Sequence, residues 1–289
     1  MSTKPDDSDA VYANLVDAHC HPTDHPSTLG CIPKLRTSRL LVMGTRSEDW
    51  EAVEQLATDH PAKVVPAFGI HPWFAASATD ASLATLKALL ARHPAALVGE
   101  IGIDGVARDR ATMEVYPLAP QLEIFKKQLL LAAETSRRVS VHTVRAHGHL
   151  LAALQDHLRD DDKTEQNGDA GDKTQGRERS IAFPPAVMNH SWSGSVETMR
   201  AMLAMKPGGD RLWFSFSTGV NGRSPKTPER IRAVPDNRVL IESDLHDAEL
   251  IDAALWDACR MVADAKGWSM LETAERTRRN AKEFLGETC

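Results

Sequence analysis

Short apolar runs rich in β-branched residues recur along the chain, each followed by a segment with helical periodicity. They are almost continuously apolar, as in parallel strands buried on both faces. Eight such units within 289 residues predict an α/β fold of the (β/α)8 barrel type. A doubly wound sheet is the rival, but it usually has a glycine-rich first turn, which this chain lacks. The predicted strands are residues 15–17, 39–45, 64–70, 95–101, 138–142, 186–190, 212–218 and 238–244.

The segments between the runs predict helices. Asp80 is the expected N-cap of the second helix, and Ser269 with Glu272 forms a capping-box pattern at the start of the last. The predicted helices are residues 47–60, 80–93, 120–138, 145–158, 195–205, 228–234, 248–266 and 269–285.

Two segments do not fit this rhythm. Residues 1–12 form a predicted flexible tail, and residues 13–289 a single barrel domain. Within it, residues 159–180 are polar and charged with no aromatic residue, so they cannot bury enough apolar surface to order themselves. We therefore expect a flexible insertion there rather than a domain boundary.

The composition excludes several functional classes. A net charge of −6 argues against a general polyanion binder, so any nucleic-acid binding requires a local site. No apolar run approaches the roughly 20 residues needed to cross a bilayer, and the polar N-terminus has no signal core. The four cysteines form no Cys-x-x-Cys pair, which favours reduced thiols. These features predict a cytoplasmic or nuclear protein without a membrane partner.

The first strand ends in His19-Cys20-His21. Side chains alternate along a strand, so both imidazoles project to the same side while Cys20 points away as a small buried residue. Two such imidazoles form half of a metal site; the alternative is a pair of surface histidines in a loop.

Other metal-binding residue types stand at the ends of later strands. In a barrel these ends form one ring, where active sites of this fold lie. A single histidine there would more often be a core residue, but six metal-binding residues at strand ends are hard to explain by chance. Such a set can hold two divalent ions that activate a water, which predicts a binuclear metal hydrolase. The six candidate ligands are His19, His21, Glu100, His142, His190 and Asp244.

The chain also resembles the TatD-like metal-dependent deoxyribonucleases, a branch of the amidohydrolase-type barrels. The matching segments span Val16 to Asp244 and include VDAHCH, GIHPW, GEIGID, QLEIFKKQLLLA, VSVHTVRAHG, NHSWSG, SFSTGVN and IESD. Two features depart from the usual family pattern and resemble its fungal branch. Leu-His-Asp follows Asp244, and Arg145 stands one residue later after His142 than the family's arginine does.

The resemblance implies a role for each ligand. His19, His21 and Asp244 would hold one ion, His142 and His190 the second, and Glu100 would bridge them. Metal identity stays open, because imidazole favours Zn²⁺ whereas carboxylate and phosphate favour Mg²⁺ or Mn²⁺. Asp17 would orient the His-x-His pair.

The implied reaction is hydrolysis of phosphodiester bonds in DNA, either single strands or DNA ends, by a two-metal-activated water. Asp244 and Glu100 would be catalytic, with Asp244 taking the water's proton, and His71 would hold the scissile phosphate.

Further substrate contacts are predicted from residue type. Arg145 is a candidate phosphate contact. Trp73 and Trp192 either stack on a nucleobase or pack the barrel rim.

Two alternatives remain from sequence. One is a hydrolase of the same barrel class that cleaves an amide, ester or lactone. The other is a catalytically silent barrel that binds a protein partner through residues 159–180.

Overall fold

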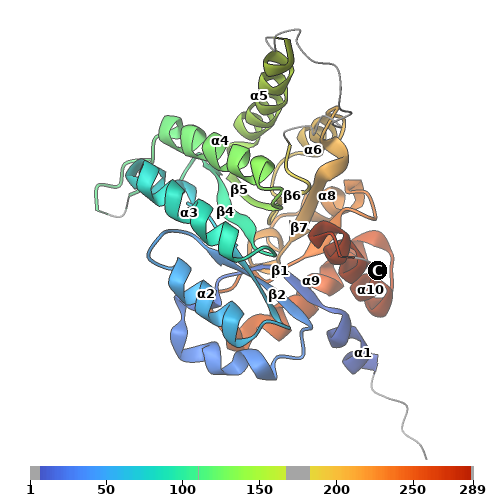
Figure 1. Ribbon diagram of the computed structural model, residues 1–289. Helices are drawn as coiled ribbons and strands as arrows, with labels where there is room; N and C mark the ends of the chain where they lie inside the picture. Colours follow the sequence, from blue (N-terminus) through green and yellow to red (C-terminus); the bar gives the residue numbers. More distant parts are fainter. Residues whose placement is uncertain (1–6, 110, 167–182, 288–289) are drawn as a thin grey trace, which may run out of the picture.

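The computed structural model describes residues 7–109, 111–166 and 183–287, and of residues 159–166 only the backbone. Its centre is one sheet of eight parallel strands in sequential order, wrapped into a barrel with helices outside (Figure 1). The predicted (β/α)8 barrel is therefore confirmed. The strands are β1 (Val16–Cys20), β2 (Arg39–Gly44), β3 (Val64–Phe68), β4 (Leu97–Asp104), β5 (Val139–Val144), β6 (Val187–Asn189), β7 (Leu212–Phe216) and β8 (Val239–Ile241).

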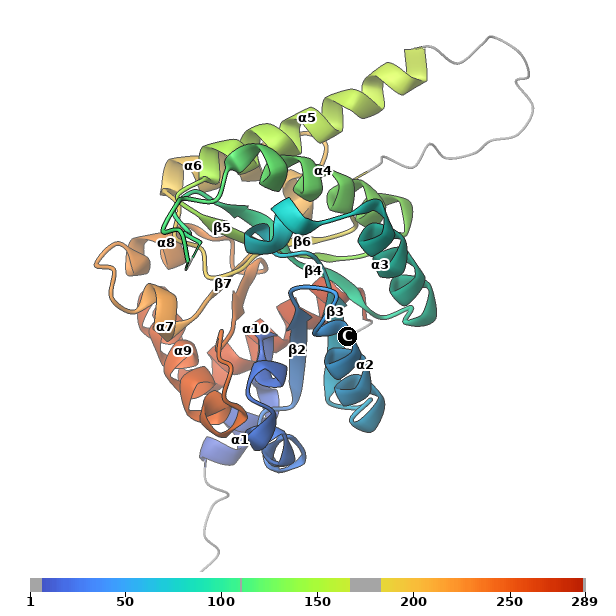
Figure 2. The same ribbon diagram turned by 90° about the vertical axis from the view of Figure 1, so that its left-hand side faces the viewer.

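The helices cover the outer face of the barrel, and α5 extends well beyond the others (Figure 2). The α-helices are α1 (Asp7–Asn14), α2 (Trp50–Asp59), α3 (Asp80–Arg92), α4 (Leu118–Glu134), α5 (His147–Gln166), α6 (Val196–Leu203), α7 (Thr218–Asn221), α8 (Thr227–Ala233), α9 (Ile251–Lys266) and α10 (Met270–Leu285). The 3₁₀ helices are η1 (Pro22–Asp24), η2 (Pro26–Lys34), η3 (Pro72–Ser77), η4 (Gly209–Arg211) and η5 (Ala248–Leu250). Ser269 caps α10 as predicted, whereas Thr79 rather than Asp80 is the N-cap of α3.

Both segments predicted to be flexible contain helix. In the tail, α1 packs beside α10 and buries Val11, and Tyr12 stacks on Trp256 of α9 with ring centroids 5.0 Å apart. Helix α5 continues through residues 159–166, the first part of the predicted insertion. Residues 1–6 and 167–180 of those two predictions lie outside the described residues.

Irregularities in two strands position polar side chains at the barrel mouth. The register shifts between Asp17 and Cys20 in β1 and between Val98 and Ile101 in β4. Such irregularities commonly re-aim a side chain beside an active site. Gly99 permits the one in β4, because a Cβ there would lie 2.9 Å from Ser140 Cβ. His19 and Glu100 stand within these two irregular stretches.

The seam between β1 and β8 is closed largely by residues that follow β8. Ser243 donates from its backbone N (2.9 Å) and its Oγ (2.6 Å) to the Asp17 carboxylate. The Asp244 backbone N donates to the His19 carbonyl (3.0 Å), and the His21 N to the Leu245 carbonyl (2.8 Å). The first strand and the segment after the last strand are thus held as neighbours.

Among the described residues, no helix combines the length and apolar character that a membrane span requires.

Candidate metal centre

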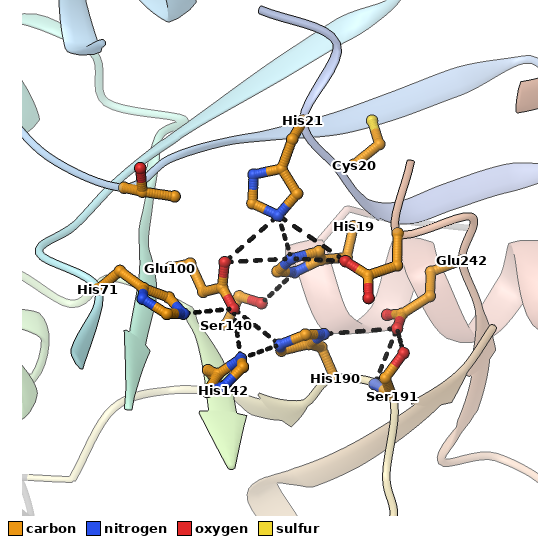
Figure 3. Close-up of polar contacts among 12 residues, drawn as sticks. His19, Cys20, His21, His71, Glu100, Ser140, His142, His190, Ser191 and Glu242 are labelled. Atoms are coloured by element: carbon orange, nitrogen blue, oxygen red, sulfur yellow. Dashed lines mark hydrogen bonds and ion pairs between the residues drawn. The ribbon is translucent and has the colours of Figure 1, made fainter. Parts of the chain in front are cut away.

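A pocket of about 230 Å³ opens at the carboxyl ends of the strands, and His21, His71, His142 and His190 are among the residues that line it. Figure 3 shows the rings of His19, His21, His71, His142 and His190 arranged around the Glu100 carboxylate. All six predicted ligands, including Asp244, lie in or beside this cluster.

Glu100 is the centre of the cluster, and its two oxygens face different histidines. Oε1 lies 2.8 Å from His190 Nε2 and 2.9 Å from His142 Nδ1. Oε2 lies 3.3 Å from His21 Nε2 and 3.5 Å from His19 Nε2. One carboxylate therefore connects the β1 side of the cluster with the β5 and β6 side.

On the β1 side, two imidazole nitrogens and a carboxylate oxygen lie so close together that hydrogen bonds alone cannot pair all of them. His19 Nε2 and His21 Nε2 are 3.0 Å apart, and each is 3.8 Å from Asp244 Oδ1. A proton on one imidazole nitrogen can serve only one of these neighbours at a time, whereas a divalent cation accepts all of them. Asp244 also has a left-handed backbone (φ 55°), which is uncommon outside glycine and clusters at functional sites.

Three groups of side chains each place their ligand atoms within 4.8 Å of one another. Imidazole and carboxylate are the donors that zinc and related divalent ions use. The residues therefore fit bound metal. The groups are His19–His21–Glu100, His19–His190–Asp244 and His71–Glu100–His142.

Burial and mutual charge shift the pKa values of the cluster in opposite directions. Burial raises the pKa of Glu100, but the surrounding histidines outweigh it and hold the pKa well below its usual range. Burial lowers the pKa of His71 to about 4. In His21, burial is outweighed by Glu100 and Asp244, and the pKa is raised to about 9. Glu100 is therefore ionised, and its negative charge faces the surrounding histidines.

Supporting contacts fix the orientation of His19 and His190. Ser140 Oγ lies 2.9 Å from His19 Nδ1. Buried Glu242 lies 3.5 Å from His190 Nδ1 and accepts hydrogen bonds from Ser191 and Ser215. A partner on the far nitrogen fixes the ring of a metal-binding histidine. Sequence reasoning did not select Ser140 or Glu242, although a carboxylate inside the last apolar run was an available signal for Glu242.

Asp104, at the end of β4, is a third residue that sequence reasoning did not select. One oxygen, Oδ2, accepts from Trp73 Nε1 (2.9 Å) and lies 3.3 Å from His142 Nε2. The other accepts from the backbone N of Val106 (2.9 Å) and of Ala107 (2.8 Å). Asp104 therefore links a candidate ligand, an aromatic residue and the loop after β4.

Asp17 is placed differently from the expectation. Its carboxylate accepts from the His19 backbone N (3.2 Å) and from Ser243, and the far nitrogen of His19 faces Ser140 instead. Burial raises the pKa of Asp17 to about 7. The carboxylate therefore orients the backbone at the seam rather than an imidazole. Cys20 is buried on the opposite side, with Sγ 3.5 Å from the Leu41 carbonyl, as predicted.

Only some of the residues predicted to contact the substrate line the pocket. His71 and Trp73 line the pocket. Trp192 is only 1% exposed and packs edge-on against Phe214, as in the alternative in which it packs the barrel rim. Arg145 is exposed but does not line the pocket.

A parallel barrel with imidazoles and carboxylates clustered at the carboxyl ends of its strands is typical of metal-dependent hydrolases. The sequence also matches a known family of such hydrolases. Residues 16–286 match the model of the family described as TatD related DNase, so the chain belongs to that family and is a metal-dependent hydrolase acting on ester bonds.

Relatives match over nearly the whole chain. Cut9-interacting protein scn1 of Schizosaccharomyces pombe is 31% identical, covering 95% of this chain and 99% of its own. Deoxyribonuclease TATDN3 of Homo sapiens is 24% identical, covering 96% of each. The crystal structure of YjjV, a TatD homologue from Escherichia coli, superimposes with a TM-score of 0.72 at 21% identity, covering 96% of this chain and 100% of that one.

Proposed function

We propose that the protein hydrolyses phosphodiester bonds in DNA at two divalent ions, Mg²⁺, Mn²⁺ or Zn²⁺. The observation that supports this most is Glu100, whose two oxygens face two separate sets of histidines. A carboxylate in that position suits a bridging ligand. The names of the family and of the human relative support DNA as the substrate.

In this proposal His19, His21 and Asp244 hold one ion, and His142 and His190 the other. The chemistry that the ions supply when bound is Lewis acidity, which lowers the pKa of water and offsets charge on phosphate. Asp244 accepts the proton of the attacking water. Its side chain is 19% exposed against 4% for Glu100, so it is the carboxylate that solvent reaches more readily.

His71 is proposed to hold the scissile phosphate rather than a metal. Its Nδ1 accepts from the Trp73 backbone N (3.3 Å), which places the proton of the neutral ring on Nε2. Nε2 faces the pocket interior, 3.5 Å from Glu100 Oε1. A protonated nitrogen is a donor for a phosphate oxygen and has no lone pair for a metal.

The test combines metal analysis with a nuclease assay. We expect close to two divalent ions per chain, and cleavage of single-stranded DNA that EDTA abolishes and one of the three metals restores. A metal-replete protein that cleaves a small ester, amide or lactone but no phosphodiester would refute the proposal and favour the other hydrolase class.

A role in protein binding is a second proposal, because the S. pombe relative is named for an interaction. The segment considered for it, residues 159–180, includes helical backbone to Gln166 and then lies outside the described residues. Deleting residues 159–180 should leave metal content unchanged. Loss of metal in the deletion would show that the segment supports the barrel instead.

The proposed location is the cytoplasm or nucleus. The free thiols of Cys20, Cys31 and Cys259 agree with a reducing compartment.

A further inference from the structure

The pocket is too small to enclose a nucleic acid. Its volume of about 230 Å³ is below the roughly 300–1,000 Å³ typical of pockets that surround a small ligand. A polymeric substrate therefore places its reacting group inside and its neighbouring nucleotides on the rim. The residues of the rim must supply much of the recognition.

One side of the rim is built from the loop after β2 and from η3. Among the described residues that line the pocket, Arg46 is the only lysine or arginine, while Asp24, Glu100 and Asp244 are acidic. A phosphate on the rim therefore has one permanent side-chain cation available.

Arg46 is held in place by its neighbours. Its guanidinium lies over the Phe74 ring, 4.9 Å from the centroid, and Nη1 lies 3.4 Å from Thr45 Oγ1. The nearby Asp49 carboxylate is 3.8 Å away and already accepts from Thr45. The side chain remains 40% exposed. A guanidinium fixed in this way can bind phosphate without first being ordered.

Trp73 is likewise fixed and exposed. Its Nε1 donates to Asp104 (2.9 Å), and its ring meets His71 edge-on, at 89° and 4.9 Å between centroids. The residue is nevertheless 41% exposed, which is unusual for so large an aromatic side chain. A rigid indole at the mouth of the pocket is a platform on which a base can stack.

We propose that Arg46 and Trp73 form a nucleotide subsite beside the metal centre, in which Arg46 binds a backbone phosphate and Trp73 stacks on the base next to the scissile bond. The inference rests on the proposed phosphodiester hydrolysis. Both faces of a base inside a duplex are covered by its neighbours, so the subsite takes an unpaired nucleotide. Stacking is tolerant of base identity, so little sequence preference follows.

The test compares a fluorescent single-stranded oligo(dT) with methyl 4-nitrophenyl phosphate, a diester without base or neighbouring phosphate. Trp73→Leu and Arg46→Ala should each lower the ratio of kcat/KM for the oligonucleotide to that for the small diester by about tenfold. Trp73→Phe, which keeps a stacking face but loses the bond to Asp104, should retain most of the ratio. Leu130→Ala, an exposed apolar residue on α4, is the control.

Oligonucleotide binding is measured separately by fluorescence anisotropy, with and without metal. Trp73→Leu and Arg46→Ala should each weaken oligonucleotide binding by about tenfold, whereas Trp73→Phe should not. If the wild-type protein cleaves neither substrate, the proposed function fails, and anisotropy alone decides on the subsite. Unchanged ratio and unchanged affinity in Trp73→Leu and Arg46→Ala would overturn the inference. A parallel oligo(U) arm determines whether the subsite also takes RNA.

Discussion

The two ends of the barrel hold charged side chains in opposite ways. At the amino end, arginines at strand starts bond partners on or beside α10. Arg39 pairs with Glu287, Arg238 Nη1 with Glu283 (2.9 Å), and Arg138 Nε donates to the Phe284 carbonyl (2.9 Å). Helices of this fold run opposite to the strands, so their C-terminal, partially negative ends lie here and attract cations. Each charge has its own partner.

At the carboxyl end, by contrast, several imidazoles share one carboxylate. Glu100 lies within 3.5 Å of the ring nitrogens of His19, His21, His71, His142 and His190. Some polar atoms here, including His21 Nδ1, have no hydrogen-bond partner among the described residues. Such unpaired groups are expected where side chains serve chemistry rather than stability. The comparison predicts that substitutions at the two ends have separable effects.

The largest effect on function is expected from Glu100→Ala. It removes the shared ligand, so the protein should lose at least one ion, and phosphodiester turnover should fall by more than roughly 10³-fold. Metal per chain and turnover are measured together. Glu283→Ala, at the other end, is the matched carboxylate control and should keep its metal. Two ions and normal turnover in Glu100→Ala would disprove the bridging assignment.

His71→Ala should separate substrate contact from metal binding within the carboxyl end. The loss of one donor to the phosphate is expected to lower the rate by about 10²–10³-fold, or roughly 3–4 kcal/mol. Metal content should stay at the wild-type value, because Nε2 is assigned as a donor. Metal analysis that finds an ion missing would make His71 a ligand instead.

Asp104→Asn should have a smaller effect through His142. The amide preserves the size of the side chain but weakens its hold on the imidazole, so metal affinity should fall by about 10–100-fold. Titration of the metal-free protein with Zn²⁺ or Mn²⁺ measures this. Asp210→Asn, an exposed carboxylate in η4, is the control, and equal affinities in the two variants would argue against the role of Asp104.

Arg138→Ala should change stability alone. Losing the bond to the Phe284 carbonyl should lower the free energy of unfolding by about 1–2 kcal/mol, measured by denaturant titration. Metal content and turnover should match the wild type. A variant of normal stability with impaired turnover would break the proposed division between the two ends.

Much of the architecture follows from local patterns in the sequence. The apolar runs identify all eight strands, and the period of two places His19 and His21 together with Cys20 behind them. A carboxylate within or just after an apolar run also indicates Glu100 and Asp244, because charged residues are rare in buried runs unless they are paired or bind metal.

The supporting contacts could not be predicted in the same way, because they depend on cross-strand register. Ser140 on β5 meets His19 on β1, a contact 121 residues apart in the chain that no local pattern indicates. Gly102 is required by the approach of the next strand, since at φ 154° a Cβ would lie 1.9 Å from the His142 carbonyl oxygen. Trp192 stands two residues after His190 and Trp73 two residues after His71, and only packing distinguishes the buried ring from the exposed one.

The seam between β1 and β8 has a consequence for how the protein is made on the ribosome. Asp17 and Ser243, which close the seam, are 226 residues apart in the chain. His19 and His21 are synthesised early, yet Asp244 joins them only after nearly the whole barrel has been translated. Closing so long a loop is slow, and it comes late in folding. A nascent or truncated chain thus lacks the assembled centre, so hydrolytic activity would be confined to barrels that have been completed.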